Sequence, residues 1–169
     1  MRFYLIGFMG CGKSFWAKKM SELHHMPLID LDEFIEQKEH DSISNIFNTK
    51  GEVYFRERES YYLNAIIEKD SQFIMATGGG TPCFHENMDL MNQTGITVLL
   101  DASADLILSN LKHETSHRPL IDKFSEDELV YFIERKLAER KAIYNQSKYI
   151  IDMNHLDESI FTQIITNHV

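Results

Sequence analysis

The chain has 169 residues, of which 43% are hydrophobic and 25% charged, and this composition is typical of one globular domain with a sizeable core. Its 26 acidic and 17 basic residues give a formal net charge of −9 at pH 7, which argues against nucleic acid as a partner. No apolar run approaches the ~20 residues of a membrane-spanning helix, and the N-terminus does not resemble a signal peptide, so we expect a cytoplasmic protein without a membrane partner.

Short apolar runs alternate with longer helical patterns along the chain. The runs predict strands at 3–8, 27–32, 73–77, 97–101 and 149–152. The helical patterns predict helices at about 13–24, 32–40, 42–49, 52–69, 85–92, 103–112, 125–147 and 156–167. This order indicates an α/β fold in which a five-stranded parallel sheet is flanked by crossover helices.

The start of the helix at 125 is marked by Ser125 and Glu128, which match a capping box. The segment before it, 113–124, is polar, contains Pro119 and lacks periodicity, so we expect a mobile loop there. Neither the two cysteines nor the eight scattered histidines suggest a disulfide framework or a zinc site.

Residues 7–14 read GFMGCGKS and match the phosphate-binding pattern GxxxxGK[ST] between a predicted strand and a predicted helix. Glycines let backbone N–H groups converge on phosphates, and the helix N-terminus adds positive charge. We therefore expect Lys13 to contact the β- and γ-phosphates and the Ser14 hydroxyl to bind Mg²⁺. Cys11 is interpreted as a small residue of the loop.

The strand at 73–77 is followed by glycines and not by the acidic residue that a switch GTPase or motor ATPase would place there. Asp30 and Asp32 are the candidates to help hold the metal instead. Residues i and i+2 at the end of a strand point to one side, and ligands gather at the carboxyl ends of parallel strands. The alternative is that one of the two only caps the next helix.

Gly78–Gly80 follow a strand directly and allow a close approach of the backbone to a ligand, or else form a plain tight turn. Arg56 and Glu59 share one face of a predicted helix at i, i+3. Their structural alternative is an ordinary surface ion pair.

Arg140 lies on one helical stripe with Ile133, Leu137 and Tyr144. A guanidinium in that position needs an anion, unless the side chain snorkels from the edge of the stripe. Arg118, just before a proline, is either a solvated charge or an arginine that closes over a nucleotide.

Taken in order, these motifs resemble the shikimate kinase family of P-loop kinases, which has the three-layer nucleoside-monophosphate-kinase fold. The ordered set is GxxxxGKS at 7–14, DxD at 30–32, IF at 46–47, FRxxE at 55–59, GGG at 78–80, RPL at 118–120 and ER at 139–140. The resemblance implies one kinase domain over 1–169, with a shikimate-binding helical insertion at about 32–62 and a mobile lid at about 112–124.

The resemblance also implies the activity: an Mg²⁺-dependent transfer of the γ-phosphoryl group of ATP to the 3-hydroxyl of shikimate. The substrate-binding residues that it implies are Asp32, Phe47, Phe55, Arg56, Glu59, Gly79, Gly80 and Arg140. The nucleotide-binding residues that it implies are Gly10, Cys11, Gly12, Lys13, Ser14, Phe15 and Arg118. The catalytic residues would be Lys13, Asp32 and Arg118. Mg²⁺ would be bound by Ser14 and, through water, by Asp30. We expect shikimate and ATP as partners of a monomer.

Two positions differ from the family pattern. Phe15 stands where the family usually has a second small hydroxyl residue that contacts the α-phosphate, and Ser109-Asn110, with Lys112 nearby, stand where it often has an arginine stacked on adenine. Two other functions stay open. One is another small-molecule kinase of this fold, such as a gluconate kinase, although the arginine and glycine motifs favour a carboxylated ring. The other is a nucleotide-gated binding module without turnover.

Overall fold

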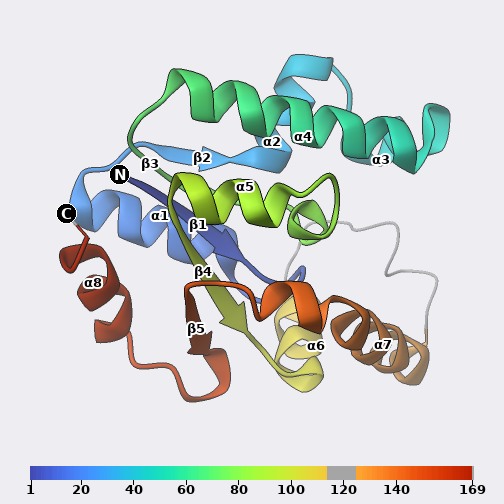
Figure 1. Cartoon of the computed structure of the whole chain (residues 1–169). Coiled ribbons are helices and arrows are strands. Elements are labelled where there is room, and N and C mark those ends of the chain that lie inside the picture. Colours follow the sequence, from blue (N-terminus) through green and yellow to red (C-terminus); the bar gives the residue numbers. More distant parts are fainter. Residues whose placement is uncertain (114–124, 169) are drawn as a thin grey trace.

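The computed structural model describes residues 1–113 and 125–168 (Figure 1). Five parallel strands form one sheet in the order β2-β3-β1-β4-β5. Their bounds are β1 (Arg2–Ile6), β2 (Leu28–Asp30), β3 (Phe73–Ala76), β4 (Ile96–Asp101) and β5 (Tyr149–Asp152). The α/β fold with a five-stranded parallel sheet, which the sequence predicts, is therefore confirmed.

The helices are α1 (Lys13–His24), α2 (Leu31–Glu39), α3 (Ile43–Thr49), α4 (Gly51–Lys69), α5 (Asn87–Thr94), α6 (Ala104–His113), α7 (Glu126–Tyr144) and α8 (Ser159–Thr166). Two 3₁₀ turns, η1 (Thr81–Cys83) and η2 (Met153–His155), follow β3 and β5. None of the described helices combines the length and apolar character that crossing a bilayer requires.

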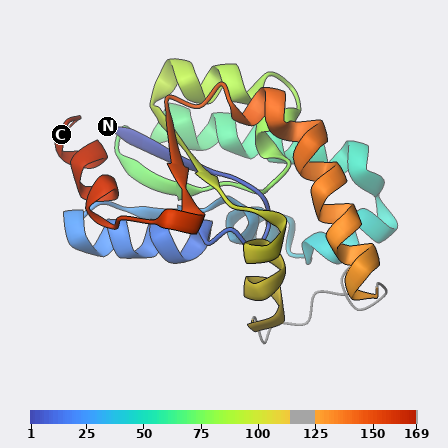
Figure 2. The ribbon, with the colours of Figure 1, turned by 90° about the horizontal axis from the view of Figure 1, so that it is seen from below.

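The sheet separates two cores, because successive side chains of a strand point to opposite faces. On β1, Phe3 and Leu5 join a cluster with α1, α6 and α8, whereas Tyr4 and Ile6 join a cluster with α2, α4 and α5. Figure 2 shows α1 on one side of the sheet and α4 and α5 on the other. The molecule therefore has three layers.

Several element ends differ from the predictions. The first strand ends at Ile6 and not at residue 8, because Gly7 begins the phosphate loop with φ 148°. The helix predicted at 85–92 spans Asn87–Thr94, since His85 and Glu86 have positive φ angles of 50° and 57°. The last two predicted helices also shorten, to Glu126–Tyr144 and Ser159–Thr166.

The sheet topology places the glycine-rich segments and Asp30 together at the carboxyl-terminal ends of the strands. The phosphate loop follows the central strand β1, Gly78–Gly80 follow the neighbouring β3, and Asp30 ends β2. The register pairs Leu5 of β1 and Asp30 of β2 with the same residue of β3, Ala76, so these strand ends lie level. Carboxyl ends of parallel strands are where ligands bind in such folds.

Candidate active site

Lys13 stabilises the phosphate loop through hydrogen bonds to its backbone. Its ammonium donates hydrogen bonds to the carbonyl oxygens of Gly7 and Phe8, both at 2.8 Å, and lies 3.8 Å from Cys11 Sγ. Gly12 has φ 97°, in the left-handed region that glycine adopts without strain. Lys13 is buried, so its charge stays beside the loop where phosphates would lie.

Ser14, in the first turn of α1, donates its hydroxyl to Asp30 Oδ2 at 2.8 Å. The other carboxylate oxygen of Asp30 accepts hydrogen bonds from the backbone N–H groups of Asp32 and Glu33, at 3.1 and 3.3 Å. Asp30 therefore caps α2. The expectation that Asp30 and Asp32 both lie at a strand end was wrong, because β2 stops at Asp30 and Asp32 lies in the first turn of α2.

The chemistry of this donor set fits Mg²⁺. A hydroxyl and a carboxylate offer two hard oxygen donors in contact, and Mg²⁺ prefers few protein ligands together with water and phosphate oxygens. Within residues 1–113 and 125–168, no three His, Cys, Asp or Glu side chains cluster as a closed metal site would require. Ser14 and Asp30 are the residues that would hold the ion.

Asp32 lies among both acidic and basic groups. Its pKa is raised to about 6, first by desolvation in the surrounding protein and then by the nearby carboxylates of Glu59 and Asp30. The charges of Lys13 and Arg56 act in the opposite direction. A carboxylate in this position, beside the phosphate loop, is suited to accept a proton or hydrogen bond from a hydroxyl.

Arg56 and Glu59 form a buried pair on α4, not the surface ion pair that was their structural alternative. Arg56 Nη1 donates to Glu59 Oε2 at 2.8 Å, and the side chain of Glu59 has no exposed surface. Thr81 donates its hydroxyl to the other oxygen of Glu59 at 2.5 Å. Arg56 Nε and Nη2 lie 3.2 Å from Glu52 Oε1, a carboxylate at the surface. Glu59 thereby orients Arg56.

Three aromatic rings lie around the Arg56 guanidinium. Its central carbon is 4.4 Å from the ring centre of Phe84, 5.0 Å from that of Phe55 and 5.8 Å from that of Phe47. Phe47 and Phe55 were expected at the site, but Phe84 and Glu52 were not. The i, i+4 spacing of Glu52 and Arg56 could have indicated the ion pair. No sequence pattern connects Phe84 with α4.

Close packing against charged side chains explains two of the three consecutive glycines. A Cβ atom at Gly78 would lie 2.8 Å from Asp32 Oδ1 and from Glu59 Oε1. A Cβ atom at Gly80 would lie 2.5 and 2.6 Å from the Arg56 Nη2 and Nη1 atoms. These distances are shorter than real Cβ contacts. The glycines therefore allow the backbone to lie directly against the charged groups.

Arg140 reaches the same glycine segment from α7. Its Nη1 donates to the Gly79 carbonyl oxygen at 3.1 Å, and the Tyr144 hydroxyl donates to that oxygen at 2.5 Å. The guanidinium also lies over the Phe8 ring, 5.3 Å from its centre. Arg140 is thus directed toward the phosphate loop and does not snorkel, and a guanidinium has further N–H donors for an anion.

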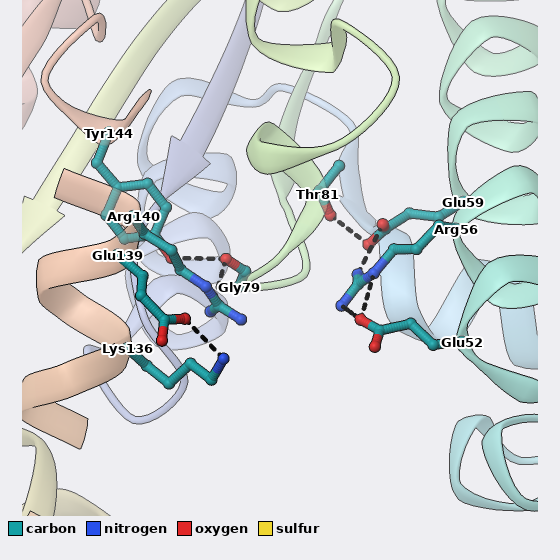
Figure 3. Close-up of polar contacts among 9 residues, drawn as sticks. All are labelled: Glu52, Arg56, Glu59, Gly79, Thr81, Lys136, Glu139, Arg140 and Tyr144. Atoms are coloured by element: carbon teal, nitrogen blue, oxygen red, sulfur yellow. Dashed lines mark hydrogen bonds and ion pairs between the residues drawn. The ribbon is translucent and has the colours of Figure 1, made fainter. Parts of the chain in front are cut away.

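The two arginines converge on one space. Figure 3 shows Arg140 on α7 and Arg56 on α4 pointing toward each other from opposite sides, with Gly79 between the two helices. A pocket of about 150 Å³ adjoins this space. Its lining is Met9, Gly10, Gly12, Lys13, Ser14, Phe15, Asp30, Asp32, Thr77 and Gly79. The expected phosphate and metal residues therefore line one pocket together with two of the expected acceptor residues, Asp32 and Gly79, whereas Arg56 and Arg140 are not in its lining.

A second pocket, of about 430 Å³, lies between the phosphate loop, α6 and η2. It is lined by Gly10, Cys11, Gly12, Phe15, Trp16, Leu106, Asn110, His113 and Met153. Asn110 Nδ2 donates to the Gly10 carbonyl oxygen at 2.8 Å, while Lys112 pairs with Glu126 at 2.7 Å. We call this second pocket the side pocket.

Arg118 lies outside the described residues. The same is true of the expected lid, apart from Lys112 and His113.

A family model and the curated relatives indicate the same family. The shikimate kinase family model matches residues 9–168. A shikimate kinase of Azobacteroides pseudotrichonymphae is 38% identical over 168 residues, covering 96% of this chain and 99% of the relative. The shikimate kinase of Bacteroides thetaiotaomicron is 36% identical over 158 residues, covering 94% and 90%.

Solved structures give the same result. A crystal structure of the Bacteroides thetaiotaomicron shikimate kinase matches with a TM-score of 0.88 at 34% identity, covering 99% of this chain and 95% of the other. The shikimate kinase of Acinetobacter baumannii in complex with shikimate matches with a TM-score of 0.85 at 30% identity, covering 99% and 94%.

Proposed function

The chain belongs to the shikimate kinase family, whose members are ATP-dependent kinases, and we propose that it transfers the γ-phosphoryl group of ATP to the 3-hydroxyl of shikimate. The products are shikimate 3-phosphate and ADP, on the route to the aromatic amino acids. The observation that carries the choice of acceptor is the convergence of Arg56 and Arg140 on one space beside the phosphate loop. Two guanidinium groups suit a small carboxylate.

The acceptor is held by the helical insertion at 32–62 together with α7. Arg56 and Arg140 bind the carboxylate, and Asp32 binds ring hydroxyls. Phe47 and Phe55, which the resemblance assigns to the apolar side of the ring, have ring centres 4.7 Å apart beside Arg56. The backbone of 79–80 completes the site, because it lies directly against both arginines.

The nucleotide is held by residues 10–15. Backbone N–H groups of the loop and the N-terminus of α1 bind its phosphates, and Lys13 neutralises their charge. Ser14 and, through water, Asp30 hold Mg²⁺. When bound, that ion would supply positive charge that offsets the negative charge of the phosphates during transfer.

Phosphoryl transfer forms a bond between the acceptor oxygen and the γ-phosphorus and breaks the bond from that phosphorus to the β–γ bridging oxygen. Asp32 accepts the hydrogen bond of the attacking hydroxyl, orients it in line, and receives its proton. Lys13 stabilises the negative charge on the transferred group. Arg118 is assigned the same role from the resemblance alone.

We propose that the chain is active as a monomer. We place this activity in the cytoplasm, where ATP is available and where Cys11 and Cys83, both free thiols, would stay reduced. Sedimentation of the purified chain, with and without ligands, would measure its oligomeric state and test whether it is a monomer.

The experiment that tests the function is an ADP-release assay with MgATP and shikimate, run beside gluconate, quinate and nucleoside monophosphates. We expect turnover with shikimate and little with the others. Turnover only with gluconate or a nucleotide would reject the acceptor assignment and keep the kinase. ATP binding without turnover on any acceptor would favour a nucleotide-gated binding module.

The matched test of the carboxylate site is Arg140→Ala against Arg135→Ala. Arg135 lies on the same helix but pairs with Glu139 at the surface, at 3.5 Å. Loss of a charged hydrogen bond worth ~1.5–3 kcal/mol should raise the KM for shikimate about tenfold or more in Arg140→Ala. The KM for ATP should change little, and Arg135→Ala should behave as the parent. Equal shikimate KM values in both variants would remove Arg140 from the site.

A further inference from the structure

Phe15 has an unusual position for a large apolar side chain. It follows Ser14 in the first turn of α1, and 64% of its surface is exposed. Its ring meets the Trp16 ring edge-on, with centroids 5.3 Å apart and an interplanar angle of 89°. Most of the side chain therefore stays accessible to a ligand.

Phe15 also stands where two pockets meet. It lines the pocket that contains Lys13 and Ser14, and it lines the side pocket between the loop, α6 and η2. A nucleotide whose phosphates lie on Lys13 and Ser14 has its nucleoside at the other end. The side pocket adjoins the same loop residues, so the nucleoside reaches it by passing Phe15.

The side pocket has the size and lining of a site for a flat, mostly apolar group. Its volume of about 430 Å³ falls within the range of small-molecule sites. Leu106 and Met153 add apolar surface to the two aromatic rings, while Asn110 and His113 add polar atoms. A nucleobase combines an apolar face with a polar edge, and this lining matches both.

Two of the described lysines near the side pocket are paired with carboxylates, because Lys112 pairs with Glu126 on α7 and Lys19, which lies over the Trp16 ring, pairs with Glu158. A phenylalanine cannot donate a hydrogen bond to a phosphate, as a hydroxyl residue at position 15 would. Base–aromatic stacking is the contact that remains open to this ring.

We propose that Phe15 stacks on the nucleoside of ATP and determines nucleotide affinity in this chain, with the base in the side pocket. The proposal rests on the nucleotide half of the proposed function and is independent of the acceptor. Because every base presents a π-face, Phe15 binds other nucleotides by the same contact.

Calorimetric titration of the shikimate-free protein tests this inference, with MgADP and with inorganic triphosphate as probes. Phe15→Ser should weaken ADP binding by about tenfold or more, since stacking on one base contributes on that scale. Triphosphate has no base, so its affinity should stay within about twofold. Phe15→Tyr keeps the ring and should bind ADP as the parent does.

Tyr61→Ser is the matched control, because it removes another exposed aromatic ring, on α4, which packs on the opposite face of the sheet from α1. Its ADP affinity should equal that of the parent. An unchanged ADP affinity in Phe15→Ser would overturn the inference, as would equal losses for ADP and triphosphate, which would place the defect in the loop. If the parent binds neither probe, the nucleotide half of the proposed function fails as well. Binding that follows Phe15 without turnover on shikimate would reject only the acceptor.

Discussion

At Gly80, one methyl group decides whether Arg56 can keep its position. The guanidinium cannot move aside at low cost, because the buried Glu59 binds it on one side and Glu52 on another. Gly80 has no positive φ angle, so the requirement for glycine comes from this close approach and not from the backbone conformation.

Gly80→Ala should therefore displace Arg56 and raise the KM for shikimate about tenfold or more, which corresponds to loss of one charged hydrogen bond. ADP affinity, measured by calorimetry, should stay at the parent value, because the phosphate loop is not in contact with the new methyl group. A shikimate KM equal to that of the parent would mean that the Arg56 side chain can shift without loss of binding and that the glycine is not required.

At the scale of elements, α2 joins the expected metal site to α4. It begins at the cap residue Asp30 and ends at Glu39, whose carboxylate accepts hydrogen bonds from two hydroxyls and one guanidinium of α4. The donors are Tyr54 at 2.6 Å, Tyr62 at 2.7 Å and Arg58 at 3.0 Å. The helix that carries Arg56 and Glu59 is thus attached to α2 through a side chain that is only 6% exposed.

These contacts hold the pKa of Glu39 at about 2, below its ordinary value, with the Tyr54 hydroxyl as the main cause. A lowered pKa stabilises the fold fully above the unfolded value of ~4.3, and this contribution is lost as the pH falls toward 2. Glu39→Gln should lower the free energy of unfolding by ~1–3 kcal/mol at pH 7, and the difference from the parent should shrink between pH 5 and pH 3.

Urea unfolding of both proteins across that range measures the effect. Glu57→Gln, at an exposed position of α4, is the control and should track the parent at every pH. A difference between Glu39→Gln and the parent that stays constant down to pH 3 would show that the carboxylate charge is not what stabilises this contact.

The sequence predicts the elements better than their ends and their mutual contacts. The alternation of apolar runs and helical patterns was sufficient for all five strands, and Ser125 with Glu128 forms the expected capping box. The start of α5 was missed because it depends on positive φ angles at two non-glycine residues. The cluster at Glu39 was missed because its partners lie 15 to 23 residues away on another helix.

At the site, too, local motifs were predicted better than contacts between elements. Motifs placed the phosphate loop, both arginines and the three glycines, because each is a local pattern on one element. Asp30 ends β2 as expected and also caps α2, an alternative that had stayed open, whereas Asp32 was wrongly assigned to the strand because the helix begins directly after Asp30. Phe84 was missed because it lies 28 residues from Arg56 and meets it only through the fold.

For the whole molecule, α7 connects the two cores that the sheet separates. Its residues Leu129 and Ile133 pack in the cluster with α1 and α6, whereas Tyr144 packs in the cluster with α4 and α5. Arg140 lies between them. An acceptor bound by Arg56 and Arg140 therefore links α4 to α7 and stabilises the folded chain as a unit.

Shikimate should accordingly raise the unfolding midpoint in the absence of nucleotide. At a concentration 100 times its dissociation constant the gain is about 2.7 kcal/mol. The methyl ester of shikimate lacks the charge that both arginines recognise and should give little protection at the same concentration. Thermal unfolding followed by circular dichroism compares the two ligands, and equal protection by both would contradict a carboxylate site.

The double use of the Asp30 carboxylate has a consequence for redesign. One oxygen caps α2 and the other accepts a hydrogen bond from the phosphate-loop serine, so this residue joins the part of the chain proposed to bind phosphate to the first part proposed to bind the acceptor. Exchanging the acceptor preference should then require a new segment after Asp30 together with changes at 79–80 and at Arg140 of α7. The proposed nucleotide-binding part of the chain would remain unchanged, provided that Asp30 is kept.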